Sequence, residues 1–182
     1  MHIRRLIIHL LFLVKSSANL LGLLISICVL RMGMLSLQLG QGYDLKVLRT
    51  IQFLYLLELL GSLSGATRQN YLVSLMQTGS RIFISGWICP DKPNKVLSVM
   101  LITWGIADTL RFSHYLVPGL RRVRAAASLL LYPIGVLCEV FLLIQRRDRL
   151  SIIALLIYIP GFIYLYYKAS NRLTSKSNKQ SK

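Results

Sequence analysis

Six long apolar stretches constrain the fold of this chain more than any other feature of its sequence. They cover roughly residues 7–30, 47–64, 71–89, 96–116, 126–145 and 150–168. A helix needs about 20 mostly apolar residues to cross the hydrocarbon core of a membrane. The stretches are continuous and lack the alternating pattern of a membrane β-barrel. Because backbone groups in lipid must hydrogen-bond internally, the sequence predicts an all-α, polytopic membrane protein with a bundle of about six transmembrane helices.

The composition indicates a single membrane domain. The 182 residues are 54% hydrophobic and 15% charged, whereas soluble domains carry about 25% charged residues. The connections at residues 65–70, 90–95 and 146–149 are too short to hold a loop domain. We therefore expect one transmembrane domain over residues 1–169, followed by a disordered, basic cytosolic tail over residues 170–182, which is rich in Ser, Lys and Asn.

The first apolar stretch has two interpretations. Residues 1–5 are basic, residues 6–14 are apolar, and residues 16–18 could pass for a cleavage site, which is the pattern of a secretory signal peptide. However, the apolar character resumes over residues 19–30, so the uncleaved segment is long enough to cross a membrane. We interpret it as the first transmembrane helix.

The basic balance fits a membrane protein better than a nucleic-acid-binding protein. The net charge is +16, and the Lys and Arg residues cluster between the apolar stretches, where they hold helix ends against anionic headgroups. Some of this charge could also serve a phosphate-bearing substrate. Lys and Arg are slightly more numerous on the side that holds both termini, which predicts that both termini lie in the cytosol. The three cysteines and three histidines have no metal-ligand spacing, so we expect no metal and no other cofactor.

Polar side chains interrupt the apolar stretches at a few positions. They are Glu58, Gln77, Arg81, Asp108, Arg111 and Glu139. Ionisable groups in a membrane are costly and usually face a cavity or a partner. The simplest interpretation is that carboxylates pair with guanidinium groups for neutralisation alone. A purely structural bundle could use apolar residues throughout, however, so the whole set suggests an intramembrane site.

Tyr132 and Glu139 are the most informative pair. They are seven residues apart, which places them on one helix face, two turns apart. Pro133 could kink the helix and open space beside them. A phenol and a carboxyl in an apolar cavity can act as an acid–base pair. This signal is weak alone, because tyrosines more often anchor helix ends at the membrane interface. We assign that interfacial role to Tyr158, Tyr164, Tyr166 and Tyr167.

Four ordered blocks of the sequence resemble one known family. Residues 131–139 read LYPIGVLCE, residues 56–60 read LLELL, residues 77–81 read QTGSR, and residues 104–115 read WGIADTLRFSHY. In that order they are similar to the YPxGxxxE, LLEhhH (h apolar), QVxSR and WxxxExxRYxxY segments of the 3-hydroxyacyl-CoA dehydratases, also called the PTPLA family. Arg124 matches the family's Arg eight residues before the Tyr. The resemblance covers roughly residues 47–168.

The sequence departs from the family pattern at three positions, which mark a divergent member. Gly61 stands where the family usually has His, Asp108 replaces a Glu, and Phe112 replaces a Tyr. The segment between Tyr115 and Arg124 is short for the family. Despite the family's phosphatase-like name, no Cys is followed by Arg at phosphatase-loop spacing, so no thiolate nucleophile is expected.

The resemblance implies a six-span protein of the endoplasmic reticulum membrane with an intramembrane active-site cavity. Its implied activity is the third step of very-long-chain fatty acid elongation, in which (3R)-3-hydroxyacyl-CoA loses water to give trans-2-enoyl-CoA. Tyr132 and Glu139 would be the catalytic pair. Further residues would support the site or bind the CoA end of the substrate: Glu58, Gln77, Arg81, Arg111, Tyr115, Arg124 and Gly135.

The implied partners are the 3-hydroxyacyl-CoA substrate, membrane lipids and other fatty acid elongation enzymes. Two alternatives remain open. The chain could be a non-catalytic membrane scaffold or paralogue of the elongation complex, in which case the intramembrane charges would be mutually paired. It could also be a small transporter, but transporters are commonly built from internal repeats and none is evident in this sequence.

Overall fold

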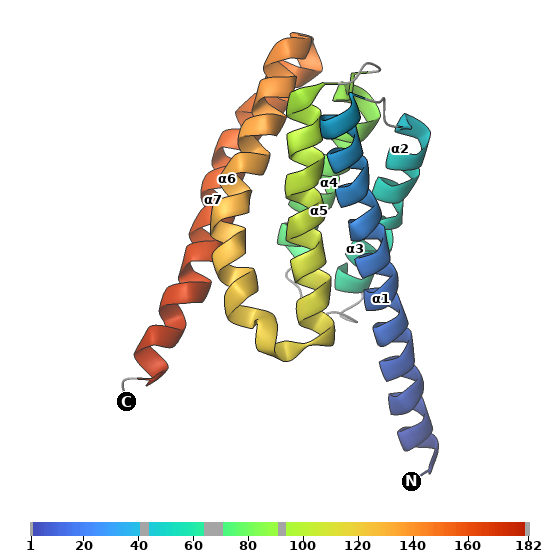
Figure 1. Cartoon of the computed structure of the whole chain (residues 1–182). Helices are drawn as coiled ribbons and strands as arrows, with labels where there is room; N and C mark the ends of the chain where they lie inside the picture. Colours follow the sequence, from blue (N-terminus) through green and yellow to red (C-terminus); the bar gives the residue numbers. More distant parts are fainter. Residues whose placement is uncertain (1, 41–43, 64–70, 91–93, 181–182) are drawn as a thin grey trace.

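The computed structural model describes residues 2–40, 44–63, 71–90 and 94–180, and these residues contain helices and no strand. In chain order the elements are α1 (His2–Leu39), α2 (Leu45–Leu54), α3 (Leu56–Leu63), α4 (Tyr71–Phe83), the π-helical turn η1 (Ile84–Ile88), α5 (Lys95–Leu116), the 3-10 turn η2 (Pro118–Leu120), α6 (Arg121–Arg146) and α7 (Arg149–Gln180). The helices lie side by side as a bundle (Figure 1). The predicted all-α class is confirmed.

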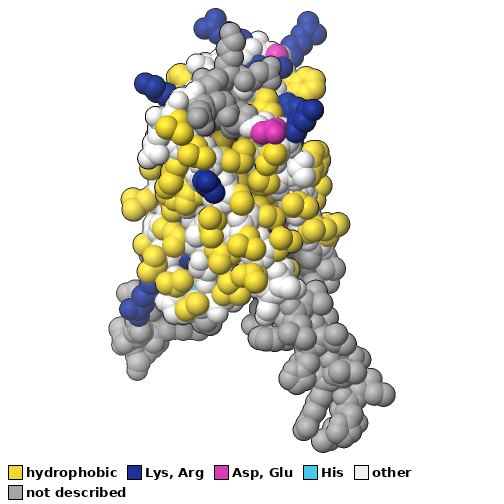
Figure 2. All heavy atoms as spheres, turned by 45° about the vertical axis from the view of Figure 1, so that its right-hand side comes forward, with side chains coloured by type: hydrophobic (Ala, Val, Ile, Leu, Met, Phe, Trp, Pro, Cys, Tyr) yellow, Lys and Arg dark blue, Asp and Glu magenta, His cyan; other side chains and the backbone are white. Residues whose placement is uncertain are grey.

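Four of these helices are long and apolar enough to cross a membrane. The spanning segments are Ser16–Leu39 in α1, Lys95–Leu116 in α5, Arg122–Arg146 in α6 and Arg149–Tyr167 in α7. On the face drawn in Figure 2, hydrophobic side chains cover the middle of the molecule, while Lys and Arg lie mainly toward its ends. This distribution suits a bundle that exposes its middle to lipid and its ends to headgroups. The chain is a polytopic membrane protein.

The predicted stretches at 47–64 and 71–89 are helical as well, but each is divided. Tyr55 separates α2 from α3, because its N–H bonds the Gln52 carbonyl at 3.2 Å in a tighter turn. α4 passes into η1, where the Cys89 N–H bonds the Ile84 carbonyl five residues back at 2.8 Å. These two irregular turns shorten the regular helices on this side of the bundle.

The start of α1 and the end of α7 lie at the same end of the bundle (Figure 1). This placement fits an even number of membrane crossings. α7 differs from our expectation, because it continues as a helix to Gln180 rather than giving way to a disordered tail after residue 169. Residues 170–180 contain neither Gly nor Pro, so the local sequence holds no strong helix breaker.

α1 and α5 pack closely because small residues lie where they cross. A Cβ atom added at Gly105 would lie only 2.6 Å from the Cα of Leu30. Small residues of this kind allow helix backbones to approach in membranes, and hydroxyl groups then bond across the interface. Two such bonds join the helices: Thr109 to Ser26 at 3.1 Å and Ser98 to Ser36 at 2.9 Å.

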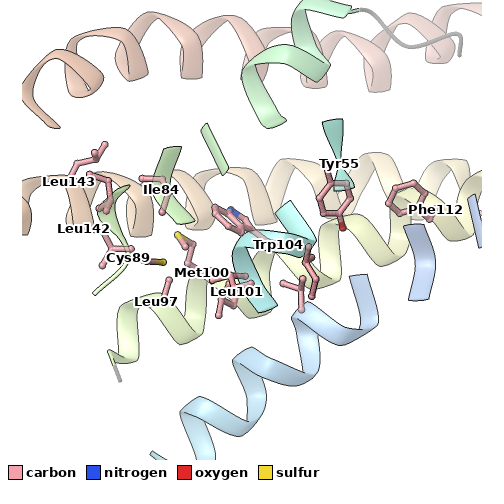
Figure 3. Packing of buried hydrophobic residues seen from close by; sticks show 14 residues of the cluster. Tyr55, Ile84, Cys89, Leu97, Met100, Leu101, Trp104, Phe112, Leu142 and Leu143 are labelled. Atoms are coloured by element: carbon pink, nitrogen blue, oxygen red, sulfur yellow. The ribbon is translucent and has the colours of Figure 1, made fainter. Parts of the chain in front are cut away.

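α5 is central to the buried core. Leu97, Met100 and Leu101 are fully buried in it, and they pack with residues of α1, α2, η1 and α6. Figure 3 shows Trp104 next to Met100 and Leu101, with Tyr55 further along the same cluster. This apolar core holds one face of α5 rigidly. The polar side chains of the candidate site meet around Trp104, which belongs to this core.

Candidate active site

α6 has one outward face and one inward face, and both candidate catalytic residues lie on the inward face. The outward side chains are Leu130, Ile134, Leu137, Phe141 and Ile144, which are spaced by three or four residues and 44–71% exposed. Between them lie Tyr132, which is half-buried, and Glu139, which is only 6% exposed. The predicted shared face of Tyr132 and Glu139 is therefore confirmed.

Two neutral donors from two other helices hold the Glu139 carboxyl. The indole Nε1–H of Trp104, on α5, donates to Oε1 at 2.9 Å. The hydroxyl of Tyr158, on α7, donates to Oε2 at 2.6 Å. Hydrogen bonds to a carboxylate are shorter and stronger than bonds between neutral groups, so the two together fix the plane of the carboxyl group. Glu139 has no ion pair among the described residues.

The contact from Tyr158 was missed, and its assignment as an interfacial anchor is wrong. Tyr158 lies at the centre of the α7 spanning segment, whereas Tyr164, Tyr166 and Tyr167 lie near the end of that segment. Its neighbours Ile157 and Ile159 are both 63% exposed, so Tyr158 points to the opposite side. Its central position in an apolar stretch was the signal that could have separated Tyr158 from the other three.

Tyr132 receives a hydrogen bond from a third helix. The Gln77 amide Nε2–H, on α4, donates to the phenolic oxygen at 3.2 Å. The Tyr132 hydroxyl has no recorded acceptor within the described ranges, and no direct hydrogen bond joins Tyr132 to Glu139 there. Gln77 thus bonds directly to the candidate catalytic phenol, and its support of the site stays a prediction.

The remaining intramembrane charges form an ion network, which we define as Glu58, Arg81, Asp108 and Arg111. Arg81 pairs with Asp108 through Nη1 and Oδ2. Arg111 bridges the two carboxylates, at 3.1 Å to Asp108 and 3.0 Å to Glu58. All four side chains are 13% exposed or less. The pairing that the neutralisation interpretation predicts is present, because the network holds two cations and two anions.

Arg81 connects this network to the Glu139 site. Its guanidinium carbon lies 5.1 Å from the centre of the Trp104 ring and 5.7 Å from that of Tyr55. Cations favour the faces of aromatic rings, and the attraction grows when water is excluded. The ion network therefore holds the same indole that donates to Glu139.

Of the other predicted site residues, Arg124 and Tyr115 lie apart from Glu139, whereas Gly135 lies one turn before Glu139 on α6. Arg124 contacts Tyr115, with Nη2 at 3.4 Å from the hydroxyl and the guanidinium carbon 5.0 Å from the ring centre, near the α5–α6 connection. A Cβ at Gly135 would meet Thr103 Cγ2 at 3.5 Å, an ordinary contact distance. The described part of the chain holds no group of three or more potential metal ligands. The active-site cavity stays a prediction.

Comparison with known proteins decides the family. The family model for protein tyrosine phosphatase-like protein, PTPLA, matches residues 52–177. This chain belongs to the PTPLA family. The matched range includes the ion network and all the Glu139 contacts, whereas α1 lies outside it.

Three curated relatives of this PTPLA protein carry the same activity in their names. It is 26% identical over 154 residues to the probable very-long-chain (3R)-3-hydroxyacyl-CoA dehydratase of Schizosaccharomyces pombe, covering 71% of this chain and 74% of the relative. It is 27% identical over 156 residues to the dehydratase PASTICCINO 2 of Arabidopsis thaliana, covering 66% and 71%. It is 25% identical over 161 residues to the dehydratase hpo-8 of Caenorhabditis elegans, covering 69% and 72%. No solved structure matches this PTPLA protein.

Proposed function

We propose that this PTPLA protein is a very-long-chain (3R)-3-hydroxyacyl-CoA dehydratase, a hydro-lyase that forms trans-2-enoyl-CoA. The names of its relatives support this activity. The observation that carries the proposal is the inward face of α6, where Tyr132 and Glu139 each receive hydrogen bonds from other helices. These contacts hold a phenol and a carboxyl two turns apart, inside a bundle whose outer surface is apolar.

In the proposed elimination, Glu139 acts as the general base and Tyr132 as the general acid. The Glu139 carboxylate takes the proton from C2 of the hydroxyacyl chain as the carbon–carbon double bond forms. The bond from C3 to its oxygen breaks, and the departing hydroxide takes the proton of the Tyr132 hydroxyl and leaves as water. Return of the proton from Glu139 to the Tyr132 phenolate closes the cycle. The amide hydrogen of Gln77, 3.2 Å from the phenolic oxygen, stabilises the negative charge that develops there.

The setting of the proposed enzyme is the endoplasmic reticulum membrane, with both termini in the cytosol and residues 1–169 as the transmembrane domain. The reaction is the third step of the elongation cycle, so other elongation enzymes supply the substrate and consume the product. Phosphates of CoA suit the basic segments at the cytosolic end of the bundle. Support of the site by Tyr115, Arg124 and Gly135 belongs to the same proposal.

A non-catalytic scaffold is the second candidate, favoured by one observation. The ion network is mutually paired, as a purely structural polar set would be. Glu139 and Tyr132 stand outside that pairing, and a scaffold has no need of a buried carboxyl held by neutral donors. This difference makes the dehydratase the better proposal.

The deciding experiment measures turnover by the purified protein in lipid nanodiscs. A very-long-chain (3R)-3-hydroxyacyl-CoA is supplied, and trans-2-enoyl-CoA is quantified by mass spectrometry. We expect turnover by the unaltered chain and a loss of about 100-fold or more in Tyr132→Phe, because general acid catalysis contributes about 10²–10⁴-fold. The matched control is Tyr167→Phe, which removes the same hydroxyl from a side chain that is 65% exposed. A chain without turnover that still binds elongation enzymes would establish the scaffold.

A further inference from the structure

The two oxygens of the Glu139 carboxyl have chemically different partners. Trp104 Nε1–H, at 2.9 Å from Oε1, can only donate a hydrogen bond. The Tyr158 hydroxyl, at 2.6 Å from Oε2, can donate or accept. Oε2 therefore keeps its hydrogen bond to Tyr158 when it gains a proton, because the Tyr158 hydroxyl can rotate and accept. The lone pair of Oε1 that accepts the Trp104 hydrogen bond cannot also hold a proton, because the two hydrogens would face each other.

The Trp104 side of this arrangement is rigid. Its ring is 4% exposed and packs in the core beside Met100 and Leu101 (Figure 3). The Arg81 guanidinium lies against the ring at 5.1 Å and is itself held by Asp108. The indole N–H thus has little freedom to move away from Oε1.

The Tyr158 side comes from a helix that is otherwise loosely held. α7 is the least buried of the four candidate spans. Ile157 and Ile159, on either side of Tyr158, point outward. Tyr158 is the described α7 side chain that reaches the Glu139 carboxyl, so α7 delivers one hydroxyl to the site.

We propose that Tyr158 is a positioning residue that keeps Glu139 Oε2 hydrogen-bonded in both protonation states, and that Oε2 is the oxygen that carries the proton taken from the substrate. Trp104 orients the other oxygen and occupies one of its lone pairs, but its N–H cannot turn to accept a hydrogen bond from a protonated carboxyl. This inference rests on the proposed dehydratase function for the identity of the substrate. The carboxyl geometry itself is independent of that function.

The kinetic test compares Tyr158→Phe with the matched control Tyr167→Phe, both in nanodiscs. Hydrogen bonds to charged groups contribute enough free energy for a loss of about 10- to 100-fold in kcat in Tyr158→Phe, with KM unchanged because the residue does not touch substrate. Tyr167→Phe should retain unaltered kcat and KM. Unchanged kcat in Tyr158→Phe, or a change confined to KM, would overturn the positioning role.

A double variant distinguishes the positioning of Glu139 by Tyr158 from a general effect of Tyr158 on helix packing. Glu139→Asp shortens the side chain and withdraws the carboxyl from Tyr158. Adding Tyr158→Phe to Glu139→Asp should then reduce kcat by less than about 3-fold, because residues in contact give non-additive effects. An equal loss in both backgrounds would mean that Tyr158 acts on something other than Glu139, and would overturn the proposal.

Infrared difference spectroscopy tests the carboxyl without any turnover. Acidification of the protein in nanodiscs should produce a protonated carboxyl band that disappears in Glu139→Gln. In Tyr158→Phe this band should move to higher frequency, because the carboxyl loses a hydrogen bond, while in Tyr167→Phe it should stay in place. An unmoved band in Tyr158→Phe refutes the proposal. An unaltered chain without dehydratase activity whose band still moves would refute the proposed function alone.

Discussion

The bundle contains two buried polar regions that treat their carboxylates in different ways. In the ion network, Asp108 and Glu58 are paired with guanidinium groups. In the Glu139 site, the carboxyl is held by an indole and a phenol, both neutral. Both solutions satisfy a carboxylate away from water, but a fixed cation locks the charge in place, whereas neutral donors leave the group able to gain and lose a proton.

The difference suggests a division of labour between stability and chemistry. The ion network joins α3, α4 and α5 and should matter most for folding. The Glu139 site joins α5, α6 and α7 through neutral bonds and should matter most for activity. The contact between Arg81 and the Trp104 ring, at 5.1 Å, is where the first region supports the second.

The largest expected effect is on activity, in Glu139→Gln. Gln keeps the size of the side chain and can still accept from Trp104 and bond Tyr158, so the melting temperature in detergent should stay within a few degrees. Dehydratase turnover should fall by about 10²–10⁴-fold, because the amide cannot take the proton. Mass-spectrometric turnover assays and thermal unfolding of the same preparation check both parts. A variant with normal turnover, or one that fails to fold, would break the comparison.

The next effect is on stability, in Asp108→Asn. This carboxylate contacts both guanidinium groups, so its neutralisation leaves two buried cations opposite one anion, Glu58. Removing one partner of a buried ion pair costs about 3–5 kcal/mol in free energy of unfolding. Reversible denaturation of the protein in mixed micelles measures that loss. A loss no greater than that of Glu139→Gln would show that the two regions do not differ as described.

Part of this comparison between the ion network and the Glu139 site could be predicted from the sequence, because the geometry within one helix is regular. Relations within one helix follow from 3.6 residues per turn, so the shared face of Tyr132 and Glu139 could be predicted. The pairing of opposite charges in a membrane could also be predicted, because lone charges there are costly. Both predictions concern local spacing or charge and need no knowledge of how helices pack.

Relations between helices could not be predicted in the same way. Tyr158 reaches Glu139 because α7 has a particular rotation and height relative to α6, and that placement depends on packing along the whole interface. The division at Tyr55 also depends on tertiary packing, since no Gly or Pro lies beside Tyr55 to mark a break in advance. The irregular turn that begins at Ile84 does contain a glycine, Gly86. The donors to Glu139 were therefore the part of the site that needed the structure.

A smaller loss of stability is expected in Glu58→Gln. Glu58 contacts Arg111 at 3.0 Å, but Arg111 keeps its second carboxylate, Asp108, at 3.1 Å. No guanidinium group is left without an anion, so the free energy of unfolding should fall by about 1–3 kcal/mol, the range for one hydrogen bond to a charged group. The same denaturation assay ranks it against Asp108→Asn. A loss larger than that of Asp108→Asn would place the centre of the ion network at Glu58 instead.

The smallest effect concerns a third kind of carboxylate, Asp148, which lies outside the spanning segments between α6 and α7. Hydrogen bonds from Ser151, including its backbone N–H at 2.7 Å, hold the pKa of Asp148 at about 2. Trp87 Nε1–H also donates to this carboxylate, at 3.2 Å. Since the pKa is lower in the folded protein than the ordinary value of about 3.9, the ionised form stabilises the fold above about pH 4, and this contribution is lost as the pH falls through about 2.

Asp148→Asn should therefore lower the melting temperature slightly at pH 7. It should also reduce the decrease in melting temperature that the unaltered chain shows as the pH falls from about 4 to about 2. Thermal unfolding of the variant and the unaltered chain across that range measures the difference. Water screens this carboxylate, so its loss should matter far less than that of Asp108, whose contacts lie inside the bundle. A pH dependence identical in the two proteins would show that the contacts of Asp148 do not contribute to stability. An effect as large as that of Asp108→Asn would mean that burial does not explain the difference between Asp108, whose side chain is 5% exposed, and Asp148, whose side chain is 33% exposed.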